Sequence, residues 1–288
     1  MTLEEIAEEI RLTMSLTTTK NAVKVYDFYV TQRHVYVVME LLRGGELLEA
    51  LVECSEYSEA DTATIMQQLF TGLESMHAQS VTHRDLKLEN LILAVKDDIT
   101  SIRIADFGLA KKMKTARAKL VEQCGTPPYV APEVITGQQY TPAVDMWAAG
   151  VIMYTLLCGA FPFDQGGDRQ ASFRLIAKGH YHRPTVRMSA YAQSLLDKLL
   201  CVNKAKRFTA SEALEHKWIV GNLGGSLGYG GGGAGAGAGA GGFETAPARI
   251  SRMTRAAESK LGSDLQAGQP EGAAPHHTTP PLRFQRHT

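Results

Sequence analysis

Three short motifs in a fixed order constrain the fold of this chain more than any other feature. Residues 83–90 read His-Arg-Asp-Leu-Lys-Leu-Glu-Asn, residues 106–108 read Asp-Phe-Gly, and residues 131–133 read Ala-Pro-Glu. Each motif alone is typical of an ordinary charged loop, turn or helix start. Three ordinary segments would rarely carry these motifs together in this order. We therefore interpret the three motifs as parts of one site.

A β-hairpin is predicted between the first two motifs. Leu91–Leu93 and Ile102–Ile104 are apolar, and a turn signal at Asp97-Asp98 separates them. The hairpin would carry the end of the first motif and lead into the second. We therefore expect side chains of both motifs to act together.

The polar residues of these motifs match the needs of phosphoryl transfer, in which a protein positions reactants, neutralises charge and accepts one proton. Asp85 is placed to accept the proton of an attacking hydroxyl, and Lys87 to reach the transferring phosphate. Asn90 and Asp106 offer oxygen ligands for Mg²⁺, a hard cation that bridges phosphate oxygens. These four are the candidate catalytic residues, and ATP and Mg²⁺ are the expected cofactors.

At these residues the chain resembles the eukaryotic protein kinase superfamily, over about residues 4–220. The segments at residues 44–47 (Gly-Gly-Glu-Leu) and 125–129 (Gly-Thr-Pro-Pro-Tyr) are most similar to the calcium/calmodulin-dependent group. Lys87 and Thr126 resemble the serine/threonine pattern. The resemblance implies an α+β kinase fold and transfer of the ATP γ-phosphoryl group to Ser or Thr.

The resemblance also divides the chain into four regions. We expect a remnant of the small lobe at residues 1–42, a complete and mostly α-helical large lobe at 43–220, a Gly/Ala linker at 221–242, and a disordered tail at 243–288. Helical periodicity supports the large lobe at four segments: Ala63–His77, Asp145–Leu157, Ser189–Leu200 and Ala210–Trp218. The apolar run 146–163 is expected to be a buried helix and not a membrane span.

The nucleotide-binding positions follow from the resemblance alone. A buried strand through Val35–Leu42 would lead to the adenine, with Met39 as gatekeeper and Ile92 beneath the ring. The residues expected to line this cofactor site are Met39, Glu40, Leu41, Leu42 and Ile92.

Further residues are implied to have structural roles. His83, Phe107 and Val25 would stack into an apolar spine, with the histidine packing and not acting as a base. Asp145 would brace the backbone of the catalytic loop. Glu133 and Arg207 would form an ion pair with a structural role.

Two acidic residues suggest the substrate class. Glu46 and Glu89 match positions that face an arginine before the phosphoacceptor in family members with basic substrates, and a carboxylate pairs well with a guanidinium. We expect protein substrates with basic residues before Ser or Thr. The alternative is that both are ordinary solvated glutamates.

The segment between the second and third motifs suggests a regulatory feature. Arg84 precedes the catalytic aspartate, an arrangement that marks kinases whose activation segment is ordered by a phosphate. Glu122 occupies the position that is usually phosphorylated. We therefore expect Glu122 to substitute for the phosphate. Alternatives are phosphorylation of Thr115, or a Glu122 side chain that has no partner.

The family pattern also includes a glycine-rich loop, a strand lysine and a helical glutamate paired with that lysine. Neither the loop nor the lysine occurs in this sequence. Glu9 best preserves the spacing to residues 21–23, whereas Glu8 better places Leu12 one turn later. We therefore do not expect residues 1–288 alone to be fully active. Three explanations compete: a fragment of a full kinase, a pseudokinase or scaffold, and a piece complemented by another chain. The first is favoured.

A reduced small lobe has a physical consequence. With one helix and two strands, at Ala22–Val30 and His34–Leu42, one strand edge stays unpaired and one apolar helix face is poorly covered. We expect exposed hydrophobic surface there.

Composition limits the partners and the compartment. Thirty basic residues balance thirty acidic ones, which argues against general nucleic-acid binding. The four cysteines, Cys54, Cys124, Cys158 and Cys201, lack the spacing of disulfides or metal ligands, and no signal peptide is evident. We therefore expect an intracellular protein, cytoplasmic or nuclear, that does not bind a membrane. Ala248–Leu261 faintly resembles a calmodulin target, although a plain basic tail is the stronger interpretation.

Overall fold

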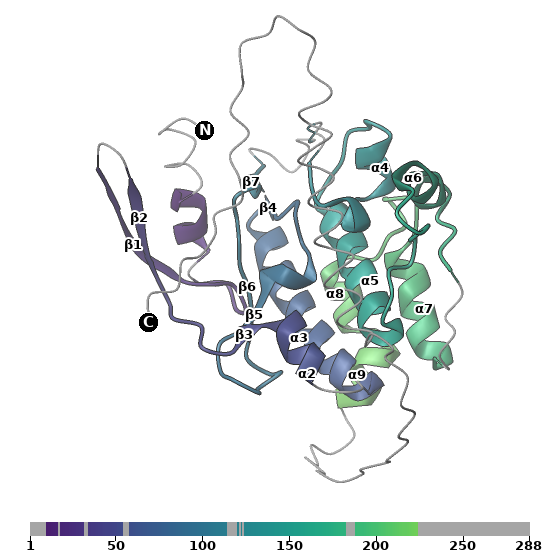
Figure 1. The fold of residues 1–288 in the computed structure, drawn as a ribbon, viewed down its shortest axis with the longest axis horizontal. Coiled ribbons are helices and arrows are strands. Elements are labelled where there is room, and N and C mark those ends of the chain that lie inside the picture. The colour runs from purple at the N-terminus through teal and green to yellow at the C-terminus, as the bar shows by residue number, and fades with distance from the viewer. Residues whose placement is uncertain are drawn as a thin grey trace, which may run out of the picture.

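The computed structural model describes residues 10–16, 18–31, 34–53, 58–113, 120, 122, 124–182 and 188–223, with the backbone alone at 51–53. Figure 1 shows a two-stranded hairpin on the left and a helical body on the right, with short strands between them. A helical large lobe and a small lobe with few strands are the α+β arrangement that the resemblance implies.

The hairpin consists of β1 (Val25–Val30) and β2 (Val35–Met39), which pair antiparallel. Tyr29 lies opposite Tyr36, and a β-bulge interrupts the register between Val25 and Asp27. Alternating β-branched and aromatic residues favour this extended pairing. Within the described part of the chain, neither outer edge of the hairpin pairs with a further strand.

A three-stranded sheet joins the hairpin to the helical body. Its order is β3 (Gly45–Glu46), β5 (Leu91–Leu93) and β6 (Ile102–Ile104), all antiparallel. A Cβ at Gly44 would lie 2.3 Å from the Cβ of Leu93, so only glycine allows this close approach of the chain to β5. A second small sheet pairs the strands β4 (Val81–Thr82) and β7 (Lys111–Lys112).

Two long helices form the centre of the core. α3 (Glu59–Ala78) starts at Ser58, whose capping box with Asp61 satisfies the free amides of the first turn. α5 (Ala143–Cys158) is buried on nearly every side, as expected for a helix that is apolar all round. α3 packs against α5, and α5 also contacts the 3-10 turn at Pro127–Tyr129.

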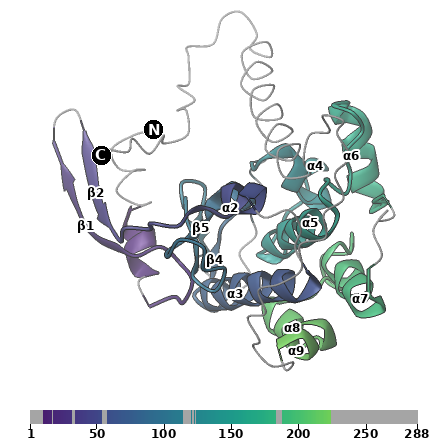
Figure 2. The same cartoon turned by 60° about the horizontal axis from the view of Figure 1, so that its bottom comes forward.

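The remaining helices surround this pair. Figure 2 shows α8 and α9 against α3, while α7 packs on α5 and α6 lies beside α4. Their bounds are α2 (Leu47–Glu53), α4 (Pro132–Ile135), α6 (Arg169–Lys178), α7 (Ala190–Leu199), α8 (Ala210–Leu214) and α9 (Lys217–Leu223), with 3-10 turns at Leu88–Asn90 and Pro127–Tyr129.

Several sequence predictions are confirmed. The strands Leu91–Leu93 and Ile102–Ile104 have the predicted bounds. The predicted helices at Ala63–His77, Asp145–Leu157 and Ser189–Leu200 correspond to α3, α5 and α7.

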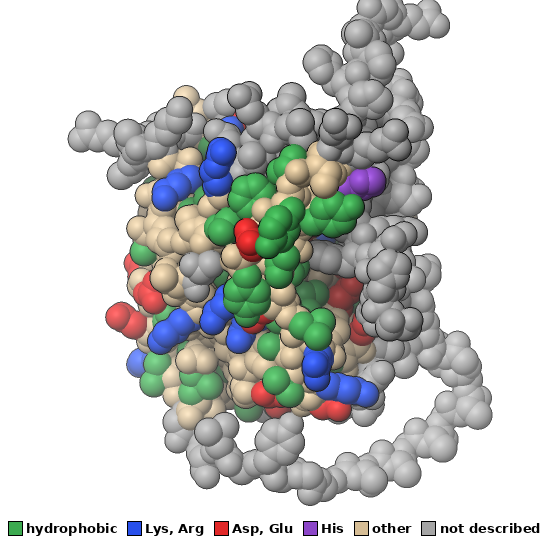
Figure 3. Space-filling model, turned by 90° about the vertical axis from the view of Figure 1, so that its left-hand side faces the viewer, with side chains coloured by type: hydrophobic (Ala, Val, Ile, Leu, Met, Phe, Trp, Pro, Cys, Tyr) green, Lys and Arg blue, Asp and Glu red, His purple; other side chains and the backbone are tan. Residues whose placement is uncertain are grey.

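Three predictions need correction. The strand expected to be buried through Val35–Leu42 ends at Met39, and its residues 36–38 are exposed because only one face of this part of the chain packs on the core. The helix expected at Ala210–Trp218 is two helices, α8 and α9, because the chain turns at Glu215 and His216 so that Trp218 can donate to Glu59 Oε2 at 2.7 Å. The apolar helix face before β1 is not poorly covered in its described part: Ile10 and Leu16 are buried. The exposed apolar surface expected on the reduced small lobe is confirmed on its hairpin (Figure 3).

Some predictions fall outside the described residues. These are the roles of Glu8, Glu9 and Thr115, the state of Cys54, the Gly/Ala linker beyond residue 223, the tail at 243–288 and its segment 248–261. The boundaries of the four predicted regions stay predictions. Among the described helices, none has the length and apolar character that crossing a membrane requires.

Candidate functional site

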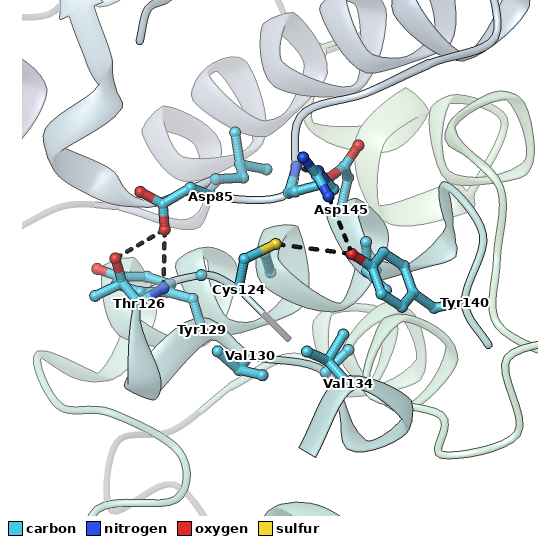
Figure 4. Close-up of a pocket in the computed structure, with 14 residues that line it drawn as sticks. Asp85, Cys124, Thr126, Tyr129, Val130, Val134, Tyr140 and Asp145 are labelled. Carbon is cyan, nitrogen blue, oxygen red and sulfur yellow. Dashed lines mark hydrogen bonds between the residues drawn. The ribbon is translucent and has the colours of Figure 1, made fainter. Parts of the chain in front are cut away.

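Asp85 is held in one orientation by the loop that follows the second motif. Its Oδ1 accepts hydrogen bonds from the backbone N–H and the hydroxyl of Thr126, both at 2.8 Å (Figure 4). Lys87 Nζ lies 3.7 Å from the other oxygen, Oδ2. Thr126 therefore anchors Oδ1. Oδ2 faces Lys87 and is the oxygen that is left to react.

Gly125 makes this contact possible. Its φ is +107°, and a Cβ there would lie 2.9 Å from the carbonyl oxygen of Arg84. Only glycine tolerates that backbone conformation and that approach. The Gly125-Thr126 sequence is therefore explained by geometry: the glycine turns the chain, and the threonine binds Asp85.

The loop that carries Asp85 is braced from α5 by Asp145. Asp145 is 1% exposed; its Oδ2 accepts the His83 N–H at 2.9 Å, and its Oδ1 accepts the Arg84 N–H at 3.0 Å. His77 Nε2, from α3, lies 2.9 Å from Oδ2. Burial alone would raise the pKa of Asp145, but the His77 hydrogen bond and charge outweigh it and lower that pKa.

Asn90 connects the loop to the second motif. Its Nδ2 donates to the carbonyl of Asp85 at 2.9 Å, and its own carbonyl accepts the N–H of Ala105 at 2.8 Å. The amide nitrogen is thereby fixed, which leaves the amide oxygen as the group able to bind a cation. Asn90 is buried and lies directly before β5, at the start of the predicted hairpin.

Asp106 follows β6 in a left-handed backbone conformation, with φ +60°. Its Oδ1 accepts the N–H of Gly108 at 3.2 Å. Asp106 and Asn90 supply carboxylate and amide oxygens, the hard ligands that suit Mg²⁺. Among the described residues no group of three His, Cys, Asp or Glu side chains is arranged around a metal, so further ligands would have to come from phosphate and water.

Arg84 and Glu122 form an ion pair between the catalytic loop and the segment before the third motif. Arg84 also has a positive φ, +71°, and its Nη1 lies 2.5 Å from Glu122 Oε2. Lys111 Nζ lies 2.6 Å from Oε1, and the hydroxyl of Tyr140 donates to the Glu122 carbonyl at 2.8 Å. The hydrogen bonds from Arg84 and Lys111 lower the pKa of Glu122 to about 2. The alternative of a Glu122 without a partner is wrong.

Glu133 and Arg207 form a bidentate ion pair. The distances are 2.7 Å from Nη1 to Oε1 and 2.9 Å from Nη2 to Oε2, and both residues are 4% exposed. The guanidinium also lies 5.1 Å from the ring centroid of Trp147. This pair fixes the third motif to the end of the domain, as the sequence analysis expected.

The predicted adenine-binding segment follows β2. Met39, Leu42 and Ile92 are partly buried against the core, whereas Leu41 is 73% exposed. Among the described residues, no hydrogen bond uses the backbone of Leu41 or Leu42. Glu40 turns inward, and its Oε1 accepts the Lys24 N–H at 2.9 Å and lies 3.4 Å from Arg103 Nε.

The other predicted residues lie around the same centre. The rings of His83 and Phe107 are 5.3 Å apart, and Val25 is buried. Glu46 lies in β3 opposite Ile92, and Glu89 lies in the 3-10 turn directly before Asn90; both are half-buried. Their role toward substrate stays a prediction.

Three residues with clear partners in the site were missed from sequence. His77 hydrogen-bonds Asp145, while Lys111 and Tyr140 contact Glu122. Tyr140 also lines a small pocket behind Asp85, between the activation segment and α5 (Figure 4). None of the three lies in a motif, and contacts across 11 or more residues leave no local pattern.

The comparisons with known proteins give the family. The model of the protein kinase domain matches residues 1–219. A calcium/calmodulin-dependent protein kinase type 1 from Macrobrachium nipponense is 40% identical over 205 residues, which are 70% of this chain and 59% of that protein.

Two human proteins give similar values. Serine/threonine-protein kinase DCLK3 is 41% identical over 204 residues, 69% of this chain and 31% of that protein. Serine/threonine-protein kinase H1 is 40% identical over 204 residues, 69% of this chain and 48% of that protein. The chain thus spans less than two thirds of the length of these relatives.

Proposed function

This chain belongs to the protein kinase family, in which it is similar to the calcium/calmodulin-dependent members, and we propose that it carries the catalytic centre of a protein serine/threonine kinase. The observation that supports this most directly is the orientation of Asp85, whose Oδ1 is bound by Thr126 and whose Oδ2 lies near Lys87. A fixed carboxylate beside a cation suits a reaction that deprotonates a hydroxyl and stabilises a phosphoryl group.

In the proposed reaction a Ser or Thr hydroxyl of the substrate approaches Asp85. Oδ2 would orient the hydroxyl and accept its proton as the new oxygen–phosphorus bond forms and the bond between the γ-phosphorus and the bridging oxygen of ATP breaks, with ADP as the leaving group. Lys87 neutralises charge on the transferring group. Thr126 maintains the angle of the carboxylate, so it acts as a positioning residue.

Asn90 and Asp106 are the residues that would hold Mg²⁺. The Asn90 nitrogen is already bound to the Asp85 carbonyl, so the amide oxygen is left for the cation. The bound cation would supply neutralisation of the phosphate charge. Asn90 hydrogen-bonds the backbone of Asp85 directly. Binding of the cation by Asn90 would therefore affect the position of the proposed base, Asp85.

ATP is proposed to bind at the end of β2. Backbone groups of Leu41 and Leu42 without hydrogen bonds among the described residues suit an adenine, which requires one donor and one acceptor. Met39 and Ile92 offer apolar surface on either side of the ring. Glu40 contributes its backbone only, because its side chain is engaged with Lys24 and Arg103.

The proposed substrates are proteins with basic residues before the phosphoacceptor. Glu46 and Glu89 are the supporting residues: Glu89 directly precedes Asn90, and Glu46 lies opposite Ile92 on β3, so both are near the catalytic loop. An arginine of the substrate would pair with a carboxylate at this position.

We further propose that Glu122 holds the activation segment without phosphorylation. Its two oxygens bind Arg84 and Lys111, as a phosphate would bind two cations. Because Arg84 adjoins Asp85, the pair joins the activation segment to the catalytic loop.

Two finer proposals concern a partner and the compartment. Several relatives are calcium/calmodulin-dependent protein kinases, which makes residues 248–261 the segment to test for calmodulin binding. The free thiols of Cys124, Cys158 and Cys201 suit a reducing, intracellular location. A non-catalytic scaffold is not favoured, because Asp85, Lys87, Asn90 and Asp106 are all present.

The decisive experiment is a Mg²⁺-ATP assay on a Ser/Thr peptide that contains arginine before the acceptor. We would compare the chain, its Asp85→Asn variant, and both after addition of a donor small lobe with a glycine-rich loop and strand lysine. Activity that requires both the lobe and Asp85 supports the proposal. A folded chimera that binds ATP but transfers no phosphate would contradict it.

A further inference from the structure

Tyr140 pairs with the activation segment through its backbone. It lies shortly before α5 and is 1% exposed. Its carbonyl accepts the Leu120 N–H at 3.1 Å, and its own N–H donates to the Leu120 carbonyl at 2.8 Å. This antiparallel bridge brings the phenol ring beside Glu122, two positions further along the activation segment.

The phenol hydroxyl joins the activation segment to the catalytic loop. It donates to the Glu122 carbonyl at 2.8 Å, and Arg84 Nη1 donates to the same phenol oxygen at 3.4 Å. Cys124 Sγ lies 3.7 Å from that oxygen (Figure 4). Burial raises the pKa of Tyr140 to about 12, so the hydroxyl keeps its proton at neutral pH and remains a donor. One buried side chain therefore contacts both partners of the Arg84–Glu122 pair.

Arg84 and Glu122 are thus connected by two routes that differ in their exposure to solvent. The direct route is the ion pair, in which the Glu122 side chain is 53% exposed. Salt screens an exposed ion pair strongly. The second route passes through the Tyr140 hydroxyl, which is neutral and buried. Salt should therefore have little effect on the second route.

We propose that Tyr140 is a positioning residue that keeps the activation segment on the catalytic loop when the ion pair of Glu122 is screened. The inference rests on the proposed kinase function, because it concerns the proposed base, Asp85. Glu122 lies four positions before Thr126, and Thr126 binds Asp85. The hydrogen bond from Tyr140 holds the backbone of this short segment, whereas the ion pair acts through a long and mostly exposed side chain. The Tyr140 hydroxyl therefore maintains the contact between Thr126 and Asp85 at salt concentrations that weaken the ion pair.

A substitution by phenylalanine separates this role from packing. Tyr140 lines a small pocket together with Val134 and Val144, and a phenylalanine ring would still fill that place. The backbone bridge to Leu120 does not depend on the side chain. Tyr140→Phe therefore removes the hydroxyl and keeps the fold around it.

Tyr154→Phe is the matched control. The Tyr154 hydroxyl donates to the His182 carbonyl at 3.0 Å, and Tyr154 is 3% exposed. This variant loses the same kind of buried hydrogen bond, from a tyrosine to a backbone carbonyl, at a place outside the activation segment. It measures what such a loss does to the domain in general.

The thiol of Cys124 reports on the activation segment in the chain as it stands. Cys124 is half-buried, and burial raises the pKa of its thiol, so this thiol should react slowly with iodoacetamide while the segment is in place. Peptide mass spectrometry gives the labelling rate of Cys124 separately from those of the other cysteines. The rates would be compared at low salt and at about 1 M NaCl, where the Debye length is about 3 Å.

The rate should depend on salt only when the Tyr140 hydroxyl is missing. In the parent and in Tyr154→Phe, the Cys124 rate should change less than about two-fold between the two conditions. In Tyr140→Phe it should rise about three-fold or more at high salt, because of the two routes only the ion pair remains. Glu122→Gln keeps the hydroxyl and has no ion pair to screen, so its rate should not depend on salt.

The salt dependence is the deciding quantity, and not the rate itself. Tyr140→Phe also removes a neighbour of the Cys124 thiol, and that loss would change the rate equally at low and high salt. A Cys124 rate in Tyr140→Phe that depends on salt no more than the rate in Tyr154→Phe would overturn the proposal.

Kinetics of the chain with the donor small lobe tests the consequence for catalysis. Tyr140→Phe should lower kcat about two- to ten-fold, and more at high salt, because one hydrogen bond that positions the segment is lost. The KM for ATP should stay unchanged. Equal kcat values for Tyr140→Phe and Tyr154→Phe at both salt concentrations would overturn the positioning role. A parent chimera without phosphoryl transfer would contradict the proposed function instead, and the Cys124 labelling would still decide whether the hydroxyl holds the segment.

Discussion

Thr126 binds Asp85 with both its backbone N–H and its hydroxyl, and both hydrogen bonds end on the same carboxylate oxygen. The two bonds fix the rotation of the carboxylate, and they leave the oxygen nearer Lys87 for the substrate. The loop before the third motif is thus connected to the proposed catalytic base through a single residue.

The first prediction removes one of these bonds. In an active form of the chain, Thr126→Val should lower kcat about ten-fold or more, because a hydrogen bond to a charged group contributes about 1.5–3 kcal/mol. Thr126→Ser keeps the hydroxyl and should stay within a few-fold of the parent. Steady-state kinetics measures this. Equal kcat values for the two variants, both folded, would contradict the positioning role.

A second prediction concerns Glu122 and pH. Its folded-state pKa, about 2, lies below the ordinary value of 4.5, so its contribution to stability is complete above about pH 4.5 and is lost as the pH falls toward 2. The side chain is 53% exposed, which limits that contribution to about 0.2–1 kcal/mol.

The measurement is urea unfolding of the parent and of Glu122→Gln. The difference in unfolding free energy should stay constant from neutral pH to about 5 and shrink below that. In activity assays Glu122→Gln should lower the rate at neutral pH, and Glu122→Asp should do so less. An unchanged rate in Glu122→Gln would remove the argument for phosphate-independent ordering.

The third prediction concerns the buried pair of Glu133 and Arg207. Glu133→Gln leaves the Arg207 charge without its counterion and should destabilise the fold by about 3–5 kcal/mol. The double change Glu133→Gln with Arg207→Met should recover part of that loss, because the buried charge is gone. Thermal and urea unfolding give both values, and a double change worse than the sum of the single changes would argue against the explanation.

The fourth prediction concerns His77, which the motifs do not include. His77→Leu removes the hydrogen bond to the buried carboxylate of Asp145 and should destabilise the fold by about 1.5–3 kcal/mol. His77→Gln can still donate from a similar position and should lose less. We also expect a larger effect on kcat than on the KM for the peptide, because Asp145 binds the backbone of Arg84 and not the substrate.

The fifth prediction tests cation binding by Asp106. Asp106→Asn should raise the Mg²⁺ concentration needed for half-maximal activity, because it removes a charged ligand. Asp97→Asn is a matched control: Asp97 has the same φ, +60°, but is exposed in the β5–β6 turn. Isothermal titration of Mg²⁺ in the presence of nucleotide gives a second readout. Equal effects of the two changes would contradict the assignment.

Local pattern predicted the parts of the fold that depend on local chemistry. The β5–β6 hairpin has two short apolar strands and an Asp-Asp turn, and it has the bounds expected from sequence. α5 was evident because it is apolar on all sides. By contrast, the break between α8 and α9 depends on Trp218 reaching Glu59, a contact across 159 positions that leaves no local signal.

The candidate site shows the same division. The motifs identified Asp85, Asn90 and Asp106, whose roles follow from residue type and spacing. His77 and Tyr140 were missed because their partners lie 68 and 18 positions away and become neighbours only after α3 and α5 have packed. The covered helix face before β1 was mispredicted for a similar reason, since burial of Ile10 and Leu16 depends on tertiary packing and not on strand number.

Arg84 and Asp106 adopt a backbone conformation that glycine accepts freely and other residues do not. Each such residue costs about 1–2 kcal/mol, in a domain whose total stability is only about 5–15 kcal/mol. Glycine at either position would relieve this backbone strain, but it would also remove the guanidinium that binds Glu122 or the carboxylate that binds the Gly108 N–H. The strained backbone at Arg84 and Asp106 is thus retained together with the two side chains that the site needs.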